Sequence, residues 1–457
     1  MRAALPRGVP VVLLLAGIAG LTVWIMAGVG IVTPARRPSY VALHGACWVL
    51  FGLACLLVRR VPSRIVPALV LGGAVLLGLA ALTGQPNTST DSARYNWDGI
   101  VQGAGISPYR YVPVDAALEP LRPSWLFPAG TTTASGGLAC PGLRAVPTEQ
   151  VGAPGQVCVA INRPQVPTIY PPVAEALFAL ARIAVPREVA YTPMQVLGLV
   201  AVVATTALLL RTLRATGRDP RWAAAFAWCP FVTMEAVANA HVDGSAAFLA
   251  LAATVLAVGG RPWRAGIVLG LGIATKFLPV LVVPPLLKRS PIRLLGAALA
   301  VVVASYVPHL IAAGDAVIGY LPGYLDEEGY DGGSRSALLS AVLPDALATI
   351  GAAVLLLAIA LVVLVKADPA DPWTAQALVV GSALIIASPR YGWYALLLVP
   401  FIAMSGRWEW FAVVVLLSVP YLAGQPGPFR IGLLGAVLVV VLATVARRRR
   451  ARSLRVT

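Results

Sequence analysis

Residues 343–365 read LPDALATIGAAVLLLAIALVVLV, an apolar run that ends at Lys366. Its length matches the roughly 20 residues that an α-helix needs to cross the hydrocarbon core of a bilayer. Similar runs recur along the chain, whose 457 residues are 58% hydrophobic and only 12% charged. Soluble domains carry about twice that charged fraction. The sequence therefore predicts an integral membrane protein and excludes a soluble globular one.

Eleven further segments have the same apolar character, with ends that are uncertain by a few residues. They are residues 9–32, 40–58, 65–83, 191–213, 222–240, 243–259, 294–313, 374–388, 391–406, 410–423 and 431–446. The run 265–287 differs because Lys276 lies at its centre, and a charged ammonium at mid-bilayer depth is costly without water or a partner. We expect a pair of broken or re-entrant half-helices there. The predicted fold is an all-α polytopic bundle of about 12–14 transmembrane helices.

The net charge of +16 reflects topology, because the basic residues form short clusters between apolar runs. The positive-inside rule places both termini in the cytoplasm, with the basic tail from Arg447 near anionic lipid. Arg36 and Arg37 are the exception to this pattern. No nucleic-acid partner is expected. The predicted location is the cytoplasmic membrane, with the long hydrophilic segments on the extracytoplasmic side.

This pattern divides the chain into five parts. They are an N-terminal three-helix membrane segment (1–84), a large extracytoplasmic loop (85–190), central membrane helices with the broken pair (191–313), a second extracytoplasmic loop (314–343), and C-terminal membrane helices with a basic tail (344–457). Within the first loop, residues 168–185 predict an amphipathic surface helix that would roof a groove for a lipid. Long loops in a chain of otherwise short connections are usually functional.

The five cysteines fall into two groups. Cys47, Cys55 and Cys229 lie in apolar runs, where they pack as small residues. Cys140 and Cys158 lie in the 85–190 loop, and outside the cytoplasm we expect them to form a disulfide.

The densest polar and aromatic cluster follows the third apolar run. Residues 90–99 read TDSARYNWDG and residues 105–111 read GISPYRY. On a helix, Asp91 shares one face with Arg94 and Tyr95, which places a carboxylate beside a guanidinium. Taken alone, this pattern is equally compatible with a solvated ion pair.

The string D-x-x-R-Y-x-W-D-G followed by G-I-S-P-Y-R-Y resembles the first outer loop of bacterial C-type (GT-C) membrane glycosyltransferases, which use polyprenyl-phosphate sugars. The likeness is greatest to glycosyltransferase family 87 and to actinobacterial lipomannan mannosyltransferases. Thr90 replaces the first acid of the family's acidic pair, and Ala93 replaces a tyrosine. Three more family motifs follow in the expected order: EAVANAHVDG at 235–244, GLGIATKFLP at 270–279 and SPRYGWY at 388–394, where Gly392 replaces a proline.

The resemblance implies a GT-C-like fold that transfers a sugar, mannose in the most similar families, from a polyprenyl-phosphate donor to a cell-envelope glycolipid or glycan. Such a transfer needs a base at the acceptor hydroxyl and cations on the departing phosphate. Asp91 is the expected base, with Asp98 in reserve because its Trp-Asp-Gly setting equally suits a helix-ending turn. The expected phosphate ligands are Lys276, Arg390 and Arg94. The expected substrate-binding residues are Tyr95, Glu235, Asn239, His241, Asp243, Tyr330, Arg335, Tyr391 and Trp393, and Asp331 belongs to the same loop.

Structural roles remain open for several of these residues. Lys276 would also suit snorkelling to an interface, Arg390 an interfacial anchor, and Glu235 a brace between helices. Neither a cofactor nor a metal is expected, because the residues show no good metal-ligand spacing, although His241 and Asp243 are two apart.

Two other functions also remain open, namely a secondary transporter or lipid flippase using Glu235 and Lys276, and a noncatalytic assembly protein. Alternating access predicts polar groups near the midplane and related halves. Convergence of Asp91, His241, Lys276 and Arg390 on one cavity would favour the transferase.

Overall fold

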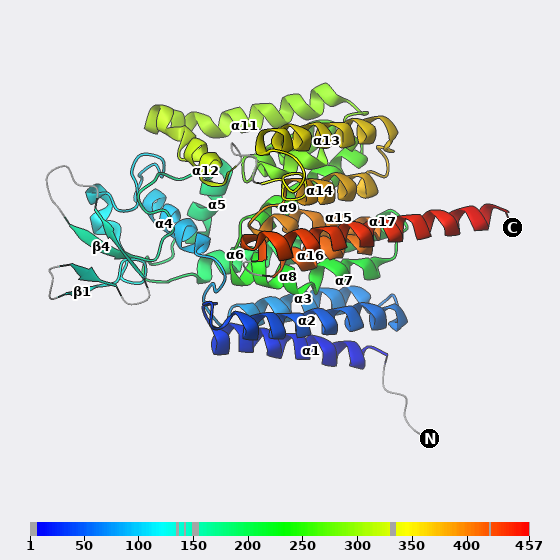
Figure 1. The fold of residues 1–457 in the computed structure, drawn as a ribbon, viewed down its shortest axis with the longest axis horizontal. Helices are drawn as coiled ribbons and strands as arrows, with labels where there is room; N and C mark the ends of the chain where they lie inside the picture. The colour runs from blue at the N-terminus through cyan, green and yellow to red at the C-terminus, as the bar shows by residue number, and fades with distance from the viewer. Residues whose placement is uncertain are drawn as a thin grey trace, which may run out of the picture.

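The computed structural model describes residues 7–133, 137–140, 143–148, 155–329, 335–419 and 422–456. Its long helices lie side by side along the long axis of the molecule, and the two short hairpins project from one end (Figure 1). The start of α1 and the end of α17 both lie toward the opposite end. The protein is an all-α polytopic membrane protein, as the sequence predicts.

The N-terminal helices form one flank of the bundle (Figure 1). They are α1 (Val9–Val23) with its π-helical continuation η1 (Trp24–Val29), α2 (Arg37–Leu57) with η2 (Val58–Arg60), and α3 (Val66–Ala81). Each α-helix has a proline in its first turn, where the missing N–H donor would have no partner within the helix.

The central helices are interrupted twice. They are α6 (Thr192–Ala215), η4 (Pro220–Ala223), α7 (Ala224–Ala227), α8 (Pro230–Val232), η5 (Thr233–Ala238), α9 (Asp243–Val258), α10 (Pro262–Ile273), η6 (Leu278–Val282) and η7 (Pro284–Leu286). The segments Pro230–Ala238 and Asp243–Val258 meet at an angle of 114°. The second interruption follows α10 at Lys276, where the sequence predicts one.

The remaining helices complete the bundle. They are α11 (Pro291–Ala313), η8 (Gly314–Ile318), α12 (Leu321–Glu327), α13 (Asp345–Lys366), α14 (Trp373–Ala387), η9 (Gly392–Leu397), α15 (Leu398–Ser405), η10 (Trp408–Trp410), α16 (Phe411–Leu417), η11 (Leu422–Gly424) and α17 (Pro426–Val456). One hydrophobic core joins residues from α1 through α17.

The number of spans differs from the prediction of 12–14. Among the described residues, six helices are long and apolar enough to cross a bilayer, or seven if the bent pair counts as one span. Five apolar helices have only 10–17 residues. Helices of that length are about 15–26 Å long, shorter than a hydrocarbon core of about 30 Å. By length and composition, the described residues therefore contain six or seven complete candidate spans.

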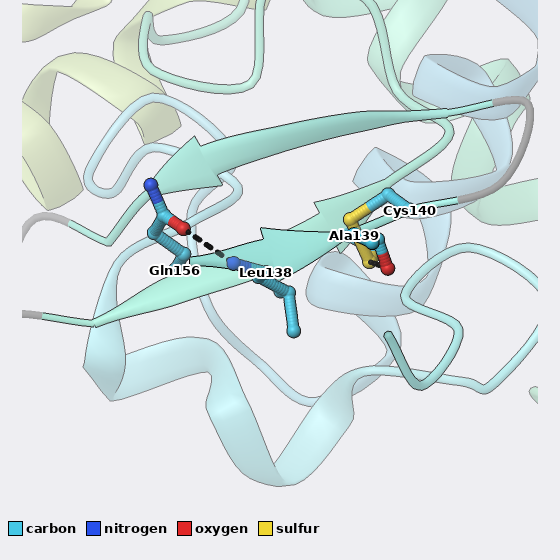
Figure 2. Close-up of a disulfide and its surroundings, with 5 residues drawn as sticks. Leu138, Ala139, Cys140 and Gln156 are labelled. Atoms are coloured by element: carbon cyan, nitrogen blue, oxygen red, sulfur yellow. Dashed lines mark hydrogen bonds between the residues drawn. A yellow bond between two sulfur atoms is a disulfide. The ribbon is translucent and has the colours of Figure 1, made fainter. Parts of the chain in front are cut away.

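The 85–190 region contains α4 (Asp91–Gly103), η3 (Ala116–Leu121), α5 (Pro172–Arg182) and two antiparallel hairpins. Strand β1 (Thr131–Thr132) pairs with β2 (Leu138–Ala139), and β3 (Arg144–Pro147) pairs with β4 (Gln156–Val159). Cys140 and Cys158 are joined by a disulfide with an S–S distance of 1.96 Å. Beside it, the side-chain oxygen of Gln156 accepts a hydrogen bond from Leu138 N (Figure 2).

Helix α4 packs between two apolar clusters. Its residues Trp97 and Val101 pack on Val159 and Ile161 of the hairpin side, while Tyr95 belongs to a separate cluster with α5. Gly99 permits the close contact with α5, because a Cβ there would lie 2.5 Å from the carbonyl oxygen of Phe178. Since α4 continues to Gly103, Gly99 is a packing residue and does not end the helix.

Candidate functional site

A cavity of about 1350 Å³ opens where the helix interruptions meet the 85–190 region. It is lined by the start of α4, by η5, by the break after α10, by α12 and by the α14–η9 junction. Three non-glycine residues with positive φ lie around the cavity: Arg163 lines it, Ala240 follows η5, and Ser388 begins the α14–η9 junction. Sparsely populated backbone conformations of this kind cluster at functional sites.

Asp91 is the first residue of α4 and lines the cavity. Its side chain is 14% exposed. Asn162 Nδ2 donates a hydrogen bond to one carboxylate oxygen, Oδ1, at 2.6 Å. The other oxygen, Oδ2, lies 3.8 Å from Nδ1 of His241. The first turn of a helix is a favourable place for a negative charge, so the carboxylate is both stabilised and accessible.

His241 lies directly behind the cavity wall, with its side chain fully buried. Its Nε2 lies 3.3 Å from Glu235 Oε2, and Glu235 lines the cavity. The His241 ring stacks on Trp393 at a centroid distance of 3.9 Å, and Trp393 stacks on Tyr391 at 4.6 Å. The histidine thus lies between two acidic side chains and an aromatic wall that lines the cavity.

Lys276 lies at the break after α10 and lines the cavity. Its Nζ is 3.2 Å from Asp243 Oδ2, and the two side chains are 17% and 3% exposed. The ammonium also lies 5.7 Å and 5.1 Å from the ring centroids of Tyr170 and Tyr394, within the range of cation–π attraction. Arg390 is exposed and lines the same cavity.

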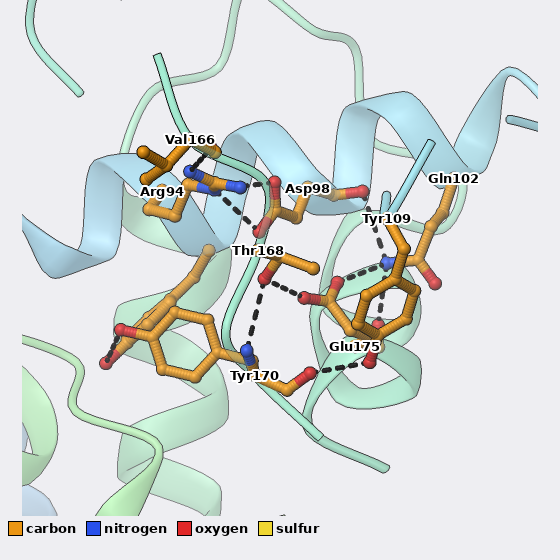
Figure 3. A network of polar contacts seen from close by, with 9 residues as sticks. Arg94, Asp98, Gln102, Tyr109, Val166, Thr168, Tyr170 and Glu175 are labelled. Atoms are coloured by element: carbon orange, nitrogen blue, oxygen red, sulfur yellow. Dashed lines mark hydrogen bonds and ion pairs between the residues drawn. The ribbon is translucent and has the colours of Figure 1, made fainter. Parts of the chain in front are cut away.

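Arg94 and Asp98 pair with each other away from the cavity. The Nε of Arg94 donates to both Asp98 oxygens at 2.9 Å, and its Nη1 donates to the Val166 carbonyl at 3.1 Å (Figure 3). Neither residue lines the cavity. The expected roles of Arg94 as a phosphate ligand and of Asp98 as a reserve base therefore disagree with their positions, because the i,i+4 pair buries both charges.

The same network contains Glu175, which the sequence analysis did not single out. Thr168 Oγ1 and Gln102 Nε2 donate to the two Glu175 oxygens at 2.7 and 2.9 Å (Figure 3). Burial, and then the charge of Asp98, raises the pKa of Glu175 well above its usual range. Burial also raises the pKa of Asp98, and Arg94 opposes that shift. This network fixes α4 against α5 and the 166–170 segment.

Three other expected substrate-binding residues have structural contacts. Tyr95 is buried between Tyr170 and Phe178. Asn239 accepts hydrogen bonds from the backbone N–H groups of residues 87 and 88 and thereby holds the segment that leads to Asp91. Arg335 is buried and paired with Glu328. Tyr330 and Asp331 lie outside the described residues.

Several cavity residues were missed by the sequence analysis. Asn162 contacts Asp91, and Arg163 pairs through two nitrogens with Glu327 at 2.8 and 2.9 Å. The hydroxyls of Tyr324 and Tyr394 lie 2.9 Å apart. Tyr394 closes the 388–394 motif and was detectable on that ground. Asn162 and Arg163 lie in the irregular stretch between β4 and α5, and Tyr324 and Glu327 lie in α12, where no local pattern marks them as site residues.

Comparison with known proteins supplies the class of the site. Residues 168–389 match the family model described as Glycosyltransferase family 87. No curated protein and no solved structure matches the chain. The matched segment includes the His241 and Lys276 interruptions but begins after α4. Within the described part of the chain, no group of three or more His, Cys, Asp or Glu could hold a metal ion.

Six of the expected site residues line the cavity: Asp91, Glu235, Lys276, Arg390, Tyr391 and Trp393. His241 and Asp243 contact them from behind. This convergence and the family match favour the transferase over the transporter and assembly alternatives. The chain is a multi-pass membrane glycosyltransferase, and its residues 168–389 match the model of glycosyltransferase family 87.

Proposed function

We propose that the cavity transfers a sugar from a polyprenyl-phosphate donor to a hydroxyl of a cell-envelope glycolipid or glycan, with Asp91 as the general base. The observation that carries this proposal is the shared cavity, in which the Asp91 carboxylate and the cations Lys276 and Arg390 are all wall residues. Mannose is the sugar that the family resemblance favours.

The chemistry follows from these positions. Asp91 accepts the proton of the acceptor hydroxyl as its oxygen bonds to the anomeric carbon, and the bond from that carbon to the phosphate oxygen breaks. The leaving group departs as polyprenyl phosphate, whose negative charge Lys276 and Arg390 offset. Apolar cavity residues such as Phe277, Leu278 and Leu281 suit the first isoprene units of the donor.

We place the site on the extracytoplasmic side of the cytoplasmic membrane and both termini in the cytoplasm. This is supported by the position of α17, whose basic end lies at the end of the molecule opposite the 85–190 region (Figure 1). The Cys140–Cys158 disulfide in that region fits an oxidising compartment.

The decisive variant is Asp91→Asn, which keeps the size of the side chain but cannot accept the proton. We expect a loss of about 10²- to 10⁴-fold in transfer rate, with binding of the donor retained. The assay uses membranes and labelled polyprenyl-phosphate sugars, one sugar at a time. The matched control is Asp115→Asn, whose side-chain oxygen still accepts from Ala117 N outside the cavity. Near-normal transfer by Asp91→Asn would overturn the proposal.

A further inference from the structure

We infer that Asn162 is a positioning residue for the catalytic carboxylate, and that the disulfide-linked hairpin fixes Asn162 in place. The inference rests on the proposed role of Asp91 as the base. Its starting point is the 2.6 Å hydrogen bond from Asn162 Nδ2 to Asp91 Oδ1, which joins residues 71 positions apart.

The contact makes the two oxygens of Asp91 different. Oδ1 is occupied by the amide of Asn162, while Oδ2 faces His241 at 3.8 Å, too far for a direct hydrogen bond. Both Asp91 and Asn162 line the cavity. Fixing one oxygen stops rotation of the carboxylate and leaves Oδ2 as the oxygen that receives the acceptor proton. Orientation of this kind matters, since a misplacement of about 1 Å can cost about 10²-fold in rate.

The hairpin sets the position of Asn162. The chain runs from Cys158, bonded to Cys140, through buried Val159 and Ile161, which pack in one cluster with Trp97 of α4. Between them, Ala160 N donates to the Leu126 carbonyl at 2.9 Å. The residue that holds Asp91 is therefore anchored to the same helix that carries Asp91.

Arg163 anchors the other side of Asn162. Its backbone has a φ of +47°, a conformation that L-residues rarely adopt. Its guanidinium reaches Glu327 of α12 through two hydrogen bonds of 2.8 and 2.9 Å. With the hairpin before it and this ion pair after it, Asn162 is constrained from both directions, and the strained residue lies directly beside the contact with the base.

The test variant is Asn162→Asp, which keeps the shape but replaces the donor with a like charge facing Asp91. We expect kcat to fall about 10- to 100-fold, while the KM for the polyprenyl-phosphate donor and the fold are unchanged. Asn162→Ala removes the hydrogen-bond donor without adding charge. It should also lower kcat and leave KM unchanged, but with a smaller decrease in kcat. The matched control is Gln425→Glu, the same amide-to-acid change at an exposed residue that does not line the cavity.

The double variant Asp91→Asn with Asn162→Asp exchanges the two side chains and tests whether Asn162 acts on catalysis or only on the stability of the fold. It restores one amide and one carboxylate, so we expect thermal stability near that of the wild type but no transfer. Transfer restored by the exchange would overturn the inference, as would normal kcat in both Asn162→Asp and Asn162→Ala. If those variants are normal while Asp91→Asn is inactive, the inference fails and the proposed function stands. If Asp91→Asn itself is active, the proposed function fails.

Discussion

The ion pair between Lys276 and Asp243 should contribute strongly to the free energy of unfolding, and Lys276 should also contribute to binding of the donor. Nζ and Oδ2 are 3.2 Å apart, and the Asp243 side chain is only 3% exposed. At an effective dielectric constant of about 20, unit charges at this distance attract by about 5 kcal/mol. Lys276→Met keeps most of the apolar stem but leaves the Asp243 carboxylate buried without its partner. Removing one partner of a buried pair costs about 3–5 kcal/mol, which is the destabilisation we expect.

The double variant Lys276→Met with Asp243→Asn removes both charges and should recover most of that loss. Asp243→Asn alone should cost less than Lys276→Met, because Lys276 is 17% exposed and faces the cavity, where water solvates it. The measurement is unfolding of the purified protein in detergent for the wild type and three variants, which together give a double-mutant cycle.

The same variants test the role of Lys276 toward the donor. The double variant should be folded yet show a raised KM for the polyprenyl-phosphate donor, because the phosphate has lost a cation. A coupling energy below about 0.5 kcal/mol would refute the reasoning from burial. A stable double variant with an unchanged donor KM would refute the assignment of Lys276 as a phosphate ligand.

Two further predictions concern the 85–190 region. In intact cells, a membrane-impermeant maleimide should label neither Cys140 nor Cys158 until reductant is added, because the two form a disulfide. A cysteine introduced as Arg449→Cys should stay unlabelled, because the basic tail is expected in the cytoplasm. Labelling of the introduced cysteine in intact cells would overturn the proposed orientation. Burial raises the pKa of Glu175, so its contribution to stability is fully present below the ordinary glutamate pKa and is lost as the pH rises through the folded-state pKa. Glu175→Gln should therefore gain stability relative to the wild type as the pH is raised from 5 to about 9, measured by thermal unfolding; parallel pH profiles would contradict a buried neutral Glu175.

The positions of many helices follow from local sequence. The predicted runs 343–365 and 191–213 correspond to α13 (Asp345–Lys366) and α6 (Thr192–Ala215), within about two residues at each end. In lipid, each backbone polar group must be satisfied within the segment, so an apolar run becomes a helix regardless of its neighbours. The interruption at Lys276 was also predictable from local sequence, because a charged residue followed by prolines does not continue a buried helix.

The partners of the polar residues depend on tertiary structure. Helical spacing placed Arg94 beside Asp91, but the structure pairs Arg94 with Asp98, four residues later on the same helix. The sequence motifs contain several residues that line the cavity, such as Asp91 and Lys276. No local pattern, however, indicates that Asn162 contacts Asp91.

By itself, the sequence therefore determined an all-α membrane protein, its main apolar segments and the motif residues that form the cavity wall. Only the tertiary structure decided that the η5–α9 pair bends by 114° and that five apolar helices are too short for the full hydrocarbon thickness. It also placed the disulfide-linked hairpin beside the cavity. The physical reason is the range of the interactions: helix formation is set by neighbouring residues, whereas bends, ion-pair partners and cavity walls depend on segments that are distant in sequence and meet only in the folded chain.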